Sequence, residues 1–359
     1  MGNLVTTIAS LRGKRILLTG DTGLKGSWLA LWLAEAGAEV YGYALPPLRE
    51  EDHFNLLGLG DRIHHFDGDI RDRDRLSSFF QQAQPELVFH LAAQALVRES
   101  YQNPKATFDT NIGGSVNLLE CVRETSSVKT LIYVTSDKCY RNREWIWGYR
   151  ENDELGGHDP YSASKAAAEI VFSAYEDSFF ASRPNFGYAS VRSGNVIGGG
   201  DWSRDRIIPD CFRSIYNNQP IMLRHPQSTR PWQYVLEPLS GYLILAGALT
   251  ENPKQFSGAW NFGPHGEANR TVKELAQAII DLWGSGQINV AQQDRDWHEA
   301  GLLHLNCDKS HHQLGWRPRW NFERTVSETV DWYRAFSEGQ SVAQKSMDQI
   351  QQYTETIYD

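Results

Sequence analysis

The 359-residue sequence has few cysteines, and none of them is spaced as a metal site or a redox pair requires. The four cysteines are Cys121, Cys139, Cys211 and Cys307. Because there is no CxxC pair and no metal-ligand spacing, we predict reduced thiols and no bound metal. This use of cysteine is typical of a cytoplasmic protein, which is the location we expect.

Long hydrophobic runs and long runs of one charge are also missing. The most apolar stretch, Leu239 to Leu249, is too short to cross a bilayer, and Met1 to Lys14 lacks the basic-then-apolar order of a secretory signal. The 35 basic and 44 acidic residues give a net charge of -9, which disfavours nucleic acid and anionic membranes as partners. Any anionic ligand must therefore be bound by local arginines.

The first strong motif joins a strand, a glycine turn and a helix. Arg15 to Thr19 is predicted to be a buried strand, and the glycines that follow it have the spacing GxxGxxG. Apolar residues then recur at helical spacing up to Ala36. Such a turn brings backbone N–H groups and a helix N-terminus to a pyrophosphate, so a dinucleotide is the expected ligand. The residues of the turn expected to bind it are Gly20, Thr22, Gly23, Leu24, Lys25 and Gly26.

Strand and helix patterns continue to alternate after the turn. Further strands are predicted at 38–44, 62–66, 86–91 and 130–136, with helical patterns between them, for example at 111–123. This alternation predicts an α/β fold with a Rossmann-type, doubly wound parallel sheet. In such folds ligands bind beyond the carboxyl ends of the strands, where the glycine turn would also lie.

The pattern changes after Asn195, where a glycine-rich segment and a stretch crowded with arginines follow. A chain of this length exceeds one small domain, so we predict a second, smaller domain of mixed α/β structure that holds the substrate. The predicted division assigns 1–193 plus 235–264 to the dinucleotide-binding domain and 194–234 plus 265–359 to the substrate-binding domain.

Tyr161 and Lys165 stand four residues apart in a helix predicted to begin after Asp159-Pro160. At this spacing the two side chains share one face, so the ammonium can lower the pKa of the phenol and make it a base for an alcohol. An isolated pair of this kind is more often a helix-start aromatic and a solvated lysine. The segment Val134 to Lys138, just upstream, favours the catalytic interpretation.

Together these motifs resemble the extended short-chain dehydrogenase/reductase family, and specifically its nucleotide-sugar 4,6-dehydratases, from about Arg15 to Pro318. Within that group, Thr135 to Tyr140 is most similar to the cytidine diphosphate glucose 4,6-dehydratases. The deoxythymidine and guanosine counterparts usually carry a glutamate at the position of Lys138. The other stretches that carry the resemblance are His90-Leu91-Ala92-Ala93 with Ser100, Thr110-Asn111-Ile112, Arg192 to Asn195, Arg230-Pro231-Trp232 and Asn261-Phe262-Gly263.

The resemblance implies a reaction that oxidises the sugar at C4, removes water across C5 and C6, and returns the hydride to C6. Tyr161 is expected to take the proton of the 4-hydroxyl, Ser136 to hydrogen-bond the same oxygen, and Lys165 to hold the cofactor ribose. Asp137 is expected to act as the acid for the departing hydroxyl. Lys138 is the candidate base at C5; alternatively, it pairs with Asp137 or a phosphate, and a water serves as the base. Deoxysugar biosynthesis for O-antigen and lipopolysaccharide is the implied role.

The cofactor implied by the resemblance is NAD, although no acid stands at the end of the second strand to bind its ribose. Only the more distant Arg49 would favour NADP, and NAD is retained because the reaction recycles it. Further cofactor contacts are expected from Asp69, Ile70, Leu91, Ala92, Ala93, Thr110 and Arg192, of which Asp69 could instead cap its turn. The residues expected to bind the nucleotide sugar are Asn195, Arg206, Arg230, Trp232 and His298, with Glu299 nearby.

Other functions remain open at this point. An epimerase, or a dehydratase for another nucleotide sugar, would share most of these motifs, but Asp137 argues against a simple 4-epimerase. A catalytically silent NAD-binding regulator would have no use for the Ser136, Tyr161 and Lys165 set. By resemblance we expect a homodimer or homotetramer, paired through the helices at 111–123 and 161–179.

Overall fold

The computed structural model describes residues 3–264, 268–290 and 302–356. Its centre is a seven-stranded sheet in the order β11-β6-β5-β4-β1-β2-β3, and every neighbouring pair is parallel. The strand order reverses beside β1, which confirms the predicted Rossmann-type sheet. The bounds of the strands are β1 Arg15–Thr19, β2 Glu39–Ala44, β3 His64–Asp67, β4 Leu87–His90, β5 Thr130–Val134, β6 Gly187–Ser193 and β11 Gly258–Phe262.

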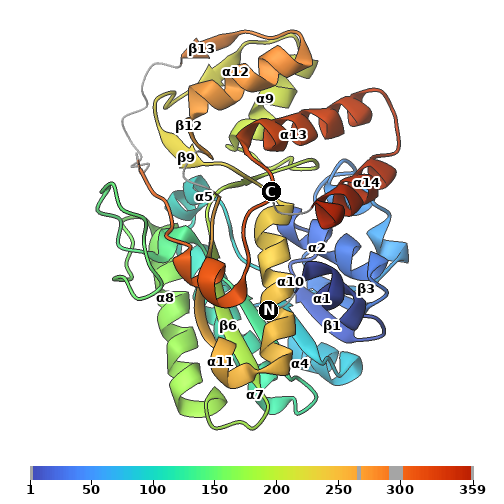
Figure 1. The fold of residues 1–359 in the computed structure, drawn as a ribbon, viewed down its shortest axis with the longest axis vertical. Coiled ribbons are helices and arrows are strands. Elements are labelled where there is room, and N and C mark those ends of the chain that lie inside the picture. Colours follow the sequence, from blue (N-terminus) through green and yellow to red (C-terminus); the bar gives the residue numbers. More distant parts are fainter. Residues whose placement is uncertain (1–2, 265–267, 291–301, 357–359) are drawn as a thin grey trace.

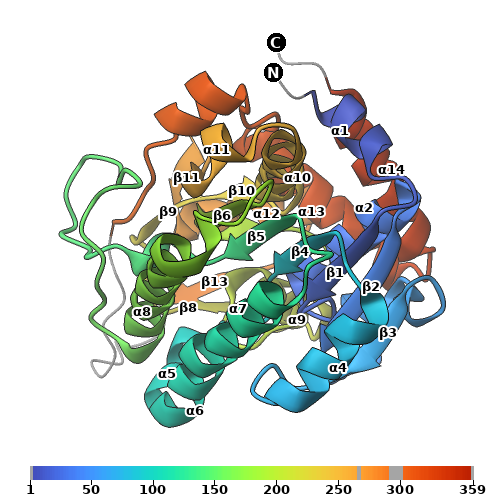
Figure 2. The same cartoon turned by 90° about the horizontal axis from the view of Figure 1, so that it is seen from below.

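Helices cover both faces of this sheet, as Figure 2 shows from below. One face packs against α1 (Leu4–Ser10), α2 (Leu24–Glu35) and α10 (Leu236–Glu251), and its core includes Trp28 and Leu243. The other face carries its own apolar cluster, and sheet strands are therefore buried on both sides. The helices of that second face are α4 (Arg73–Ala83), α7 (Gly114–Glu124) and α8 (Pro160–Tyr175).

Helix α8 begins where the sequence predicts. The Asp159 carboxylate accepts a hydrogen bond from the backbone N–H of Ser162 at 2.9 Å, and Pro160 occupies the first helical turn, where its missing N–H costs nothing. Helix α7 differs from the prediction, because 109–113 forms a π-helical turn (η2) before the regular helix starts at Gly114. Such insertions widen one turn of a helix and often occur near functional sites.

A second region lies above the sheet in Figure 1. It contains three two-stranded sheets and the helices packed against them. Its elements are β7 (Val196–Ile197) with β10 (Gln233–Tyr234), β8 (Ile221–Leu223) with β13 (Ile288–Val290), β9 (Thr229–Pro231) with β12 (Asn269–Thr271), α9 (Ile207–Tyr216), α12 (Val272–Trp283) and α13 (Phe322–Ser337).

The C-terminal helix α14 (Val342–Glu355) returns to the main sheet. The Tyr353 ring meets Trp32 of α2 edge-on at 5.9 Å between centroids, and its hydroxyl group lies 3.0 Å from that of Ser240 in α10. The C-terminal helix is therefore a packed part of the fold. One apolar cluster also continues from Leu18 of β1 to Ile279 of α12, and the predicted division into two domains stays a prediction.

The remaining short elements connect these layers. They are α3 (His53–Leu56), η1 (Leu59–Asp61), α5 (Val97–Gln102), α6 (Pro104–Phe108), η3 (Asp137–Cys139), η4 (Glu176–Phe180), α11 (Pro253–Phe256) and η6 (Ser310–Leu314). Among the described residues, no helix is both long and apolar enough to cross a membrane.

Candidate active site

A cleft of ≈ 1090 Å³ opens at the carboxyl ends of the strands, between the main sheet and the second region. Residues directly after four strands line it: Gly20 after β1, Asp69 near the end of β3, Ala92 after β4 and Ser136 after β5. A pocket for one small ligand has a volume of roughly 300–1,000 Å³, so this cleft lies just above that range. Its place is the one the sequence predicts for the ligands.

Most residues predicted for the site meet in this cleft, and two groups do not. Arg192 does not line it. His298 and Glu299 lie outside the described residues. The predicted residues that do line it are Gly20, Thr22, Gly23, Leu24, Lys25, Gly26, Asp69, Ile70, Leu91, Ala92, Ala93, Thr110, Ser136, Asp137, Lys138, Tyr161, Lys165, Asn195, Arg206, Arg230 and Trp232.

The glycine turn closely approaches its neighbours. Gly20 has a φ of +79°, and a Cβ atom there would lie 2.7 Å from the backbone nitrogen of Ala92. A Cβ atom on Gly26 would lie 1.9 Å from the carbonyl oxygen of Gly20. Only glycine fits at both positions, and the N-terminus of α2 faces the cleft at Gly23. This turn fits the pyrophosphate of a dinucleotide.

Lys25 adds a cation to the floor of the same turn. Its ammonium donates a hydrogen bond to the Ser193 hydroxyl group at 2.6 Å. Burial lowers the pKa of Lys25 to about 7; Asp137 opposes this shift, whereas Arg206 and Lys165 add to it. The charge of Lys25 therefore responds to anions that enter the cleft near neutral pH.

At the expected adenosine end of the cleft no acid directly follows β2, although Arg49 and Asp52, further along the chain, also line the cleft and pair with each other. Leu45, Pro46 and Pro47 line it there. Asp69 accepts a hydrogen bond from the backbone N–H of Arg71 at 2.9 Å and pairs with the Arg71 guanidinium, which holds the pKa of the Asp69 carboxyl below its usual range. The alternative interpretation, in which Asp69 caps its own turn, describes the observed contacts.

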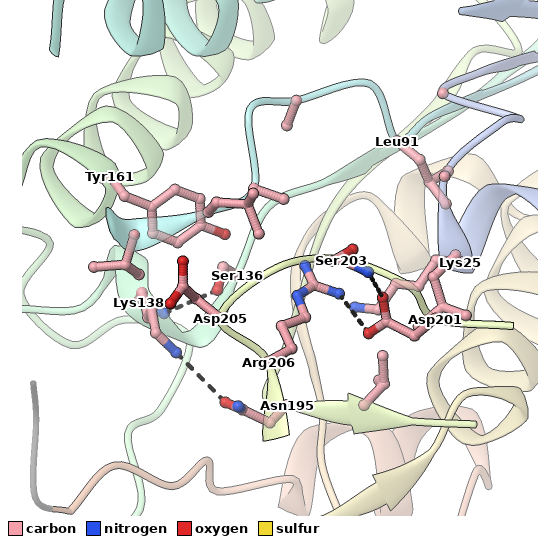
Figure 3. A pocket seen from close by; sticks show the side chains of 18 of the residues that line it. Lys25, Leu91, Ser136, Lys138, Tyr161, Asn195, Asp201, Ser203, Asp205 and Arg206 are labelled. Carbon is pink, nitrogen blue, oxygen red and sulfur yellow. Dashed lines mark hydrogen bonds and ion pairs between the residues drawn. The ribbon is translucent and has the colours of Figure 1, made fainter. Parts of the chain in front are cut away.

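Tyr161 points into the cleft, and Figure 3 shows its hydroxyl group directed towards Ser136. Burial raises the pKa of Tyr161 to about 12, although the hydrogen bond with Ser136 and the charge of Arg206 lower it. Lys165 is not among the leading influences on the pKa of Tyr161, so the expected effect of this lysine on the phenol stays a prediction. The cation that does act on it, Arg206, comes from the opposite side of the cleft.

Lys165 lies one turn along α8 from Tyr161 and is itself buried. Burial lowers the pKa of Lys165 to about 8, and the carboxylate of Glu169, one further turn along, opposes that shift. Half or more of the Lys165 side chains therefore carry a charge below pH 8. A charged lysine here suits a ribose hydroxyl or a developing phenolate.

Asp137 and Lys138 form the short helical turn η3 directly after β5. The buried Asp137 carboxyl accepts a hydrogen bond from the Ser136 hydroxyl group at 2.8 Å. The Lys138 ammonium lies 3.7 Å from Asp137 and 3.5 Å from the side-chain oxygen of Asn195. The pairing of Lys138 with Asp137, which the sequence left open, is the observed arrangement.

Arg192 belongs to a buried network beneath this catalytic segment. Its guanidinium donates hydrogen bonds to both oxygens of Glu169, at 2.9 and 2.7 Å, and to the Tyr140 hydroxyl group at 2.7 Å. Glu169 also accepts hydrogen bonds from Thr135 and Ser190. The predicted cofactor contact of Arg192 is thus not formed, because its side chain faces α8 beneath the catalytic segment and does not face the cleft.

The remaining predicted substrate residues lie on the second region. The Arg206 guanidinium donates a hydrogen bond to the buried Asp201 carboxylate at 3.2 Å, as the dashed line in Figure 3 marks. Arg230 donates to the carbonyl oxygen of Thr229 at 2.8 Å. Trp232 is buried and donates from its indole nitrogen to the carbonyl oxygen of Arg270 at 3.0 Å.

Arg98 and Asp205, which line the cleft, were not singled out by the sequence, and Arg224 was noted only as part of the arginine-rich stretch after Asn195. Arg98 of α5 and Arg224, after β8, both pair with Asp205, at 3.5 and 2.7 Å. Arg98 is distant in the chain from the other two, which lie 19 residues apart, so no local pattern predicts that all three meet. Within the described ranges, no group of three histidine, cysteine, aspartate or glutamate side chains is placed to hold a metal.

Comparison with known proteins agrees with this geometry. A family model for GDP-mannose 4,6 dehydratase matches residues 17–329. The CDP-glucose 4,6-dehydratase of Salmonella typhimurium is 47% identical over 346 residues, which cover 95% of this chain and 96% of that protein.

Solved structures share the fold. An epimerase, Mth375 from Methanothermobacter thermautotrophicus, superimposes with a TM-score of 0.79 at 24% identity, covering 96% of this chain and 98% of its own. The dTDP-glucose 4,6-dehydratase of Bacillus anthracis, solved in complex with NAD, gives a TM-score of 0.76 at 21% identity, covering 91% and 99%. The match over most of the chain shows that this protein belongs to the GDP-mannose 4,6 dehydratase family.

Proposed function

We propose that this chain is a CDP-glucose 4,6-dehydratase that uses NAD and converts CDP-glucose to CDP-4-keto-6-deoxyglucose and water. The observation that carries the proposal is the nearly full-length match to the Salmonella typhimurium CDP-glucose 4,6-dehydratase. The cleft supports it, because Tyr161, Ser136 and Lys165 line the same cavity as the glycine turn. The glycine turn supports the dinucleotide.

The residues of the cleft divide the work of the reaction. Tyr161 takes the proton of the sugar 4-hydroxyl, with Ser136 hydrogen-bonded to the same oxygen. NAD, when bound, would supply the hydride acceptor, and the positive charge of its oxidised ring would favour the phenolate of Tyr161. The carboxyl of Asp137 protonates the departing 6-hydroxyl. Lys165 binds the cofactor ribose.

The reaction also requires a base that removes the proton at C5. Lys138 lies within ion-pair distance of Asp137, so it acts as a base only after giving up its proton. We propose Lys138 as this base. Changing Lys138 to glutamine is expected to abolish exchange of the C5 hydrogen with solvent deuterium, measured by mass spectrometry of the sugar; normal exchange would assign the step to water.

An activity assay separates the proposed function from its alternatives. The purified protein is incubated with NAD and, separately, with the glucose conjugates of CDP, dTDP, GDP and UDP, and the alkali-induced absorbance of a 4-keto-6-deoxy product is measured. We expect product from CDP-glucose. Product from another conjugate alone would show that the substrate carries a different nucleotide base. An epimerised sugar would favour an epimerase, and no change in any conjugate would favour a catalytically silent regulator.

Two further features belong to the same proposal. We propose a cytoplasmic location, which the four buried, free cysteines support. We also propose a homodimer or homotetramer paired through α7 and α8, because Ile170 and Phe179 are exposed apolar residues on and after α8. Sedimentation of the wild type and of Ile170→Glu tests the pairing, and a wild-type monomer would contradict it.

A further inference from the structure

The cleft contains an ion bridge that the reaction as described does not use. The Asp205 carboxylate lies 2.7 Å from the guanidinium of Arg224 and 3.5 Å from that of Arg98. Arg98 belongs to α5 beside the main sheet, and Arg224 follows β8 in the second region. Asp205 therefore connects the two sides of the cleft through one shared anion.

The surroundings of Asp205 are strongly cationic. Arg204 and Arg206 flank it in the chain, and Arg230 lines the same cleft. Only Arg206 of these has a buried carboxylate partner, Asp201. A doubly charged diphosphate is the type of ligand that several converging guanidinium groups bind best, because each fork matches two phosphate oxygens.

The exposure of this ion bridge favours replacement of the Asp205 carboxylate by another anion. The side chains of Asp205 and Arg224 are 40% and 30% exposed, and exposed ion pairs contribute little to stability. A diphosphate brings more charge and more acceptor oxygens than one carboxylate, so it competes well for both arginines. Asp205 also has a φ of +61°, a conformation that aspartate and asparagine adopt more readily than most residues.

We propose that Arg98 and Arg224 bind the diphosphate of the nucleotide sugar, and that Asp205 holds them in place as a competing anion that this diphosphate displaces. The inference rests on the proposed function, because it takes a nucleoside diphosphate sugar as the ligand. A nucleoside diphosphate can then displace Asp205 from the two arginines, whereas a ligand without phosphate cannot. The bridge makes these three residues specificity determinants of the cleft.

Calorimetric titration in the presence of NAD tests the exchange with three probes: CDP, inorganic pyrophosphate and cytidine. Asp205→Asn, which keeps a residue suited to positive φ, should lower the Kd of CDP about threefold, because one competing exposed pair is removed. Arg98→Gln and Arg224→Gln should each raise it about tenfold. Cytidine binding should not change in any variant, because it carries no phosphate.

Two controls separate exchange from a general change of charge or shape. Asp331→Asn removes a carboxylate of similar exposure, 43%, that pairs with Lys345 outside the cleft, and it should leave all three Kd values unchanged. In the Arg98→Gln/Arg224→Gln background, Asp205→Asn should no longer lower the Kd of CDP, because the effect of Asp205 acts through the two arginines. A gain that persists in that background would overturn the inference.

The probes also keep this inference apart from the substrate assignment. If wild type failed to bind CDP while pyrophosphate followed the predicted order of variants, the CDP-glucose assignment would be wrong and the diphosphate exchange supported. If wild type bound CDP but Asp205→Asn left its Kd unchanged or raised it, the exchange would be wrong and the assignment intact.

Discussion

Two ion pairs near the cleft differ in their exposure to solvent. Arg192 and Glu169, beneath the catalytic segment, are 4% and 3% exposed and are joined by two short hydrogen bonds. The side chains of Asp205 and Arg224, on the substrate side, are 40% and 30% exposed, and the Asp205 carboxylate is shared with Arg98. The same pairing of charges therefore serves two purposes within one site.

The difference follows from the cost of leaving a charge alone. A buried charge that loses its partner has no water to replace it, so the first pair must persist and holds β5, β6 and α8 in register. An exposed charge that loses its partner is solvated at once, so the second pair can separate whenever a stronger anion arrives. We call the side of the cleft with the catalytic segment and the Arg192–Glu169 pair the fixed side. The side with the Asp205–Arg224 pair is the adaptable side.

Removal of the phenol from the fixed side should have the largest effect. Tyr161→Phe keeps the buried ring and deletes the proton acceptor, so we expect kcat to fall about a thousandfold, which corresponds to about 4 kcal/mol in the barrier. The rate of 4-keto product formation measures the loss. The Kd of CDP should not change, because Tyr161 is not part of the arginine cluster around Asp205.

The matched control is another buried tyrosine with one hydrogen bond. Tyr133→Phe removes a hydroxyl group that donates to Ser115 at 2.6 Å outside the cleft, and it should leave kcat within a factor of two. An equal loss of kcat in both variants would show that a buried hydroxyl group matters only for structure. The assignment of Tyr161 as the base would then be wrong.

Breaking the buried pair tests the comparison directly. Arg192→Met leaves the Glu169 carboxylate buried without its cation, and we expect the free energy of unfolding to fall by about 3 kcal/mol in urea titrations. The exposed counterpart, Arg224→Met, should lose less than about 1 kcal/mol. Similar losses in the two variants would remove the distinction between a fixed side and an adaptable side.

A double variant shows whether the loss comes from the stranded charge. Arg192→Met with Glu169→Leu replaces both partners by apolar side chains of similar size, and it should regain most of the stability that Arg192→Met loses. If the double variant is as unstable as the single one, the hydrogen bonds to Tyr140, Thr135 and Ser190 stabilise the fold more than the ion pair does.

Much of the fixed side could be predicted from the sequence. Its residues follow strands or begin a helix, and a strand-turn-helix pattern places a side chain by local geometry alone. Tyr161 after the Asp159 cap and Ser136 after β5 therefore met as expected. The overall sheet and the glycine turn were predictable for the same reason.

The misplaced and missed residues depend on tertiary contacts. The motif around Arg192 does not predict that the side chain of this arginine faces Glu169, a residue of α8. The sign of the pKa shift at Tyr161 depends on the extent of burial, which the spacing to Lys165 does not report. The bridge joins Arg98 to Asp205 and Arg224, which are far from Arg98 in the chain, and only the folded cleft brings the three together.

The smallest predicted effect concerns the pH dependence of the fixed side. Burial lowers the pKa of Lys165 to about 8, whereas an unfolded lysine titrates near about 10.4. Between these values the unfolded chain binds the extra proton, so the stability of wild type relative to Lys165→Met should rise with pH, by at most about 1.4 kcal/mol per unit. Below pH 8 the difference should be constant, because both states of wild type are protonated there. Urea titrations at pH 7, 8, 9 and 10 measure it, and Lys129→Met, at an exposed position, controls for the loss of a lysine as such. A difference that stays constant up to pH 10 would mean that Lys165 keeps its full charge in the fold, and that solvent reaches the fixed side of the cleft as it reaches the adaptable one.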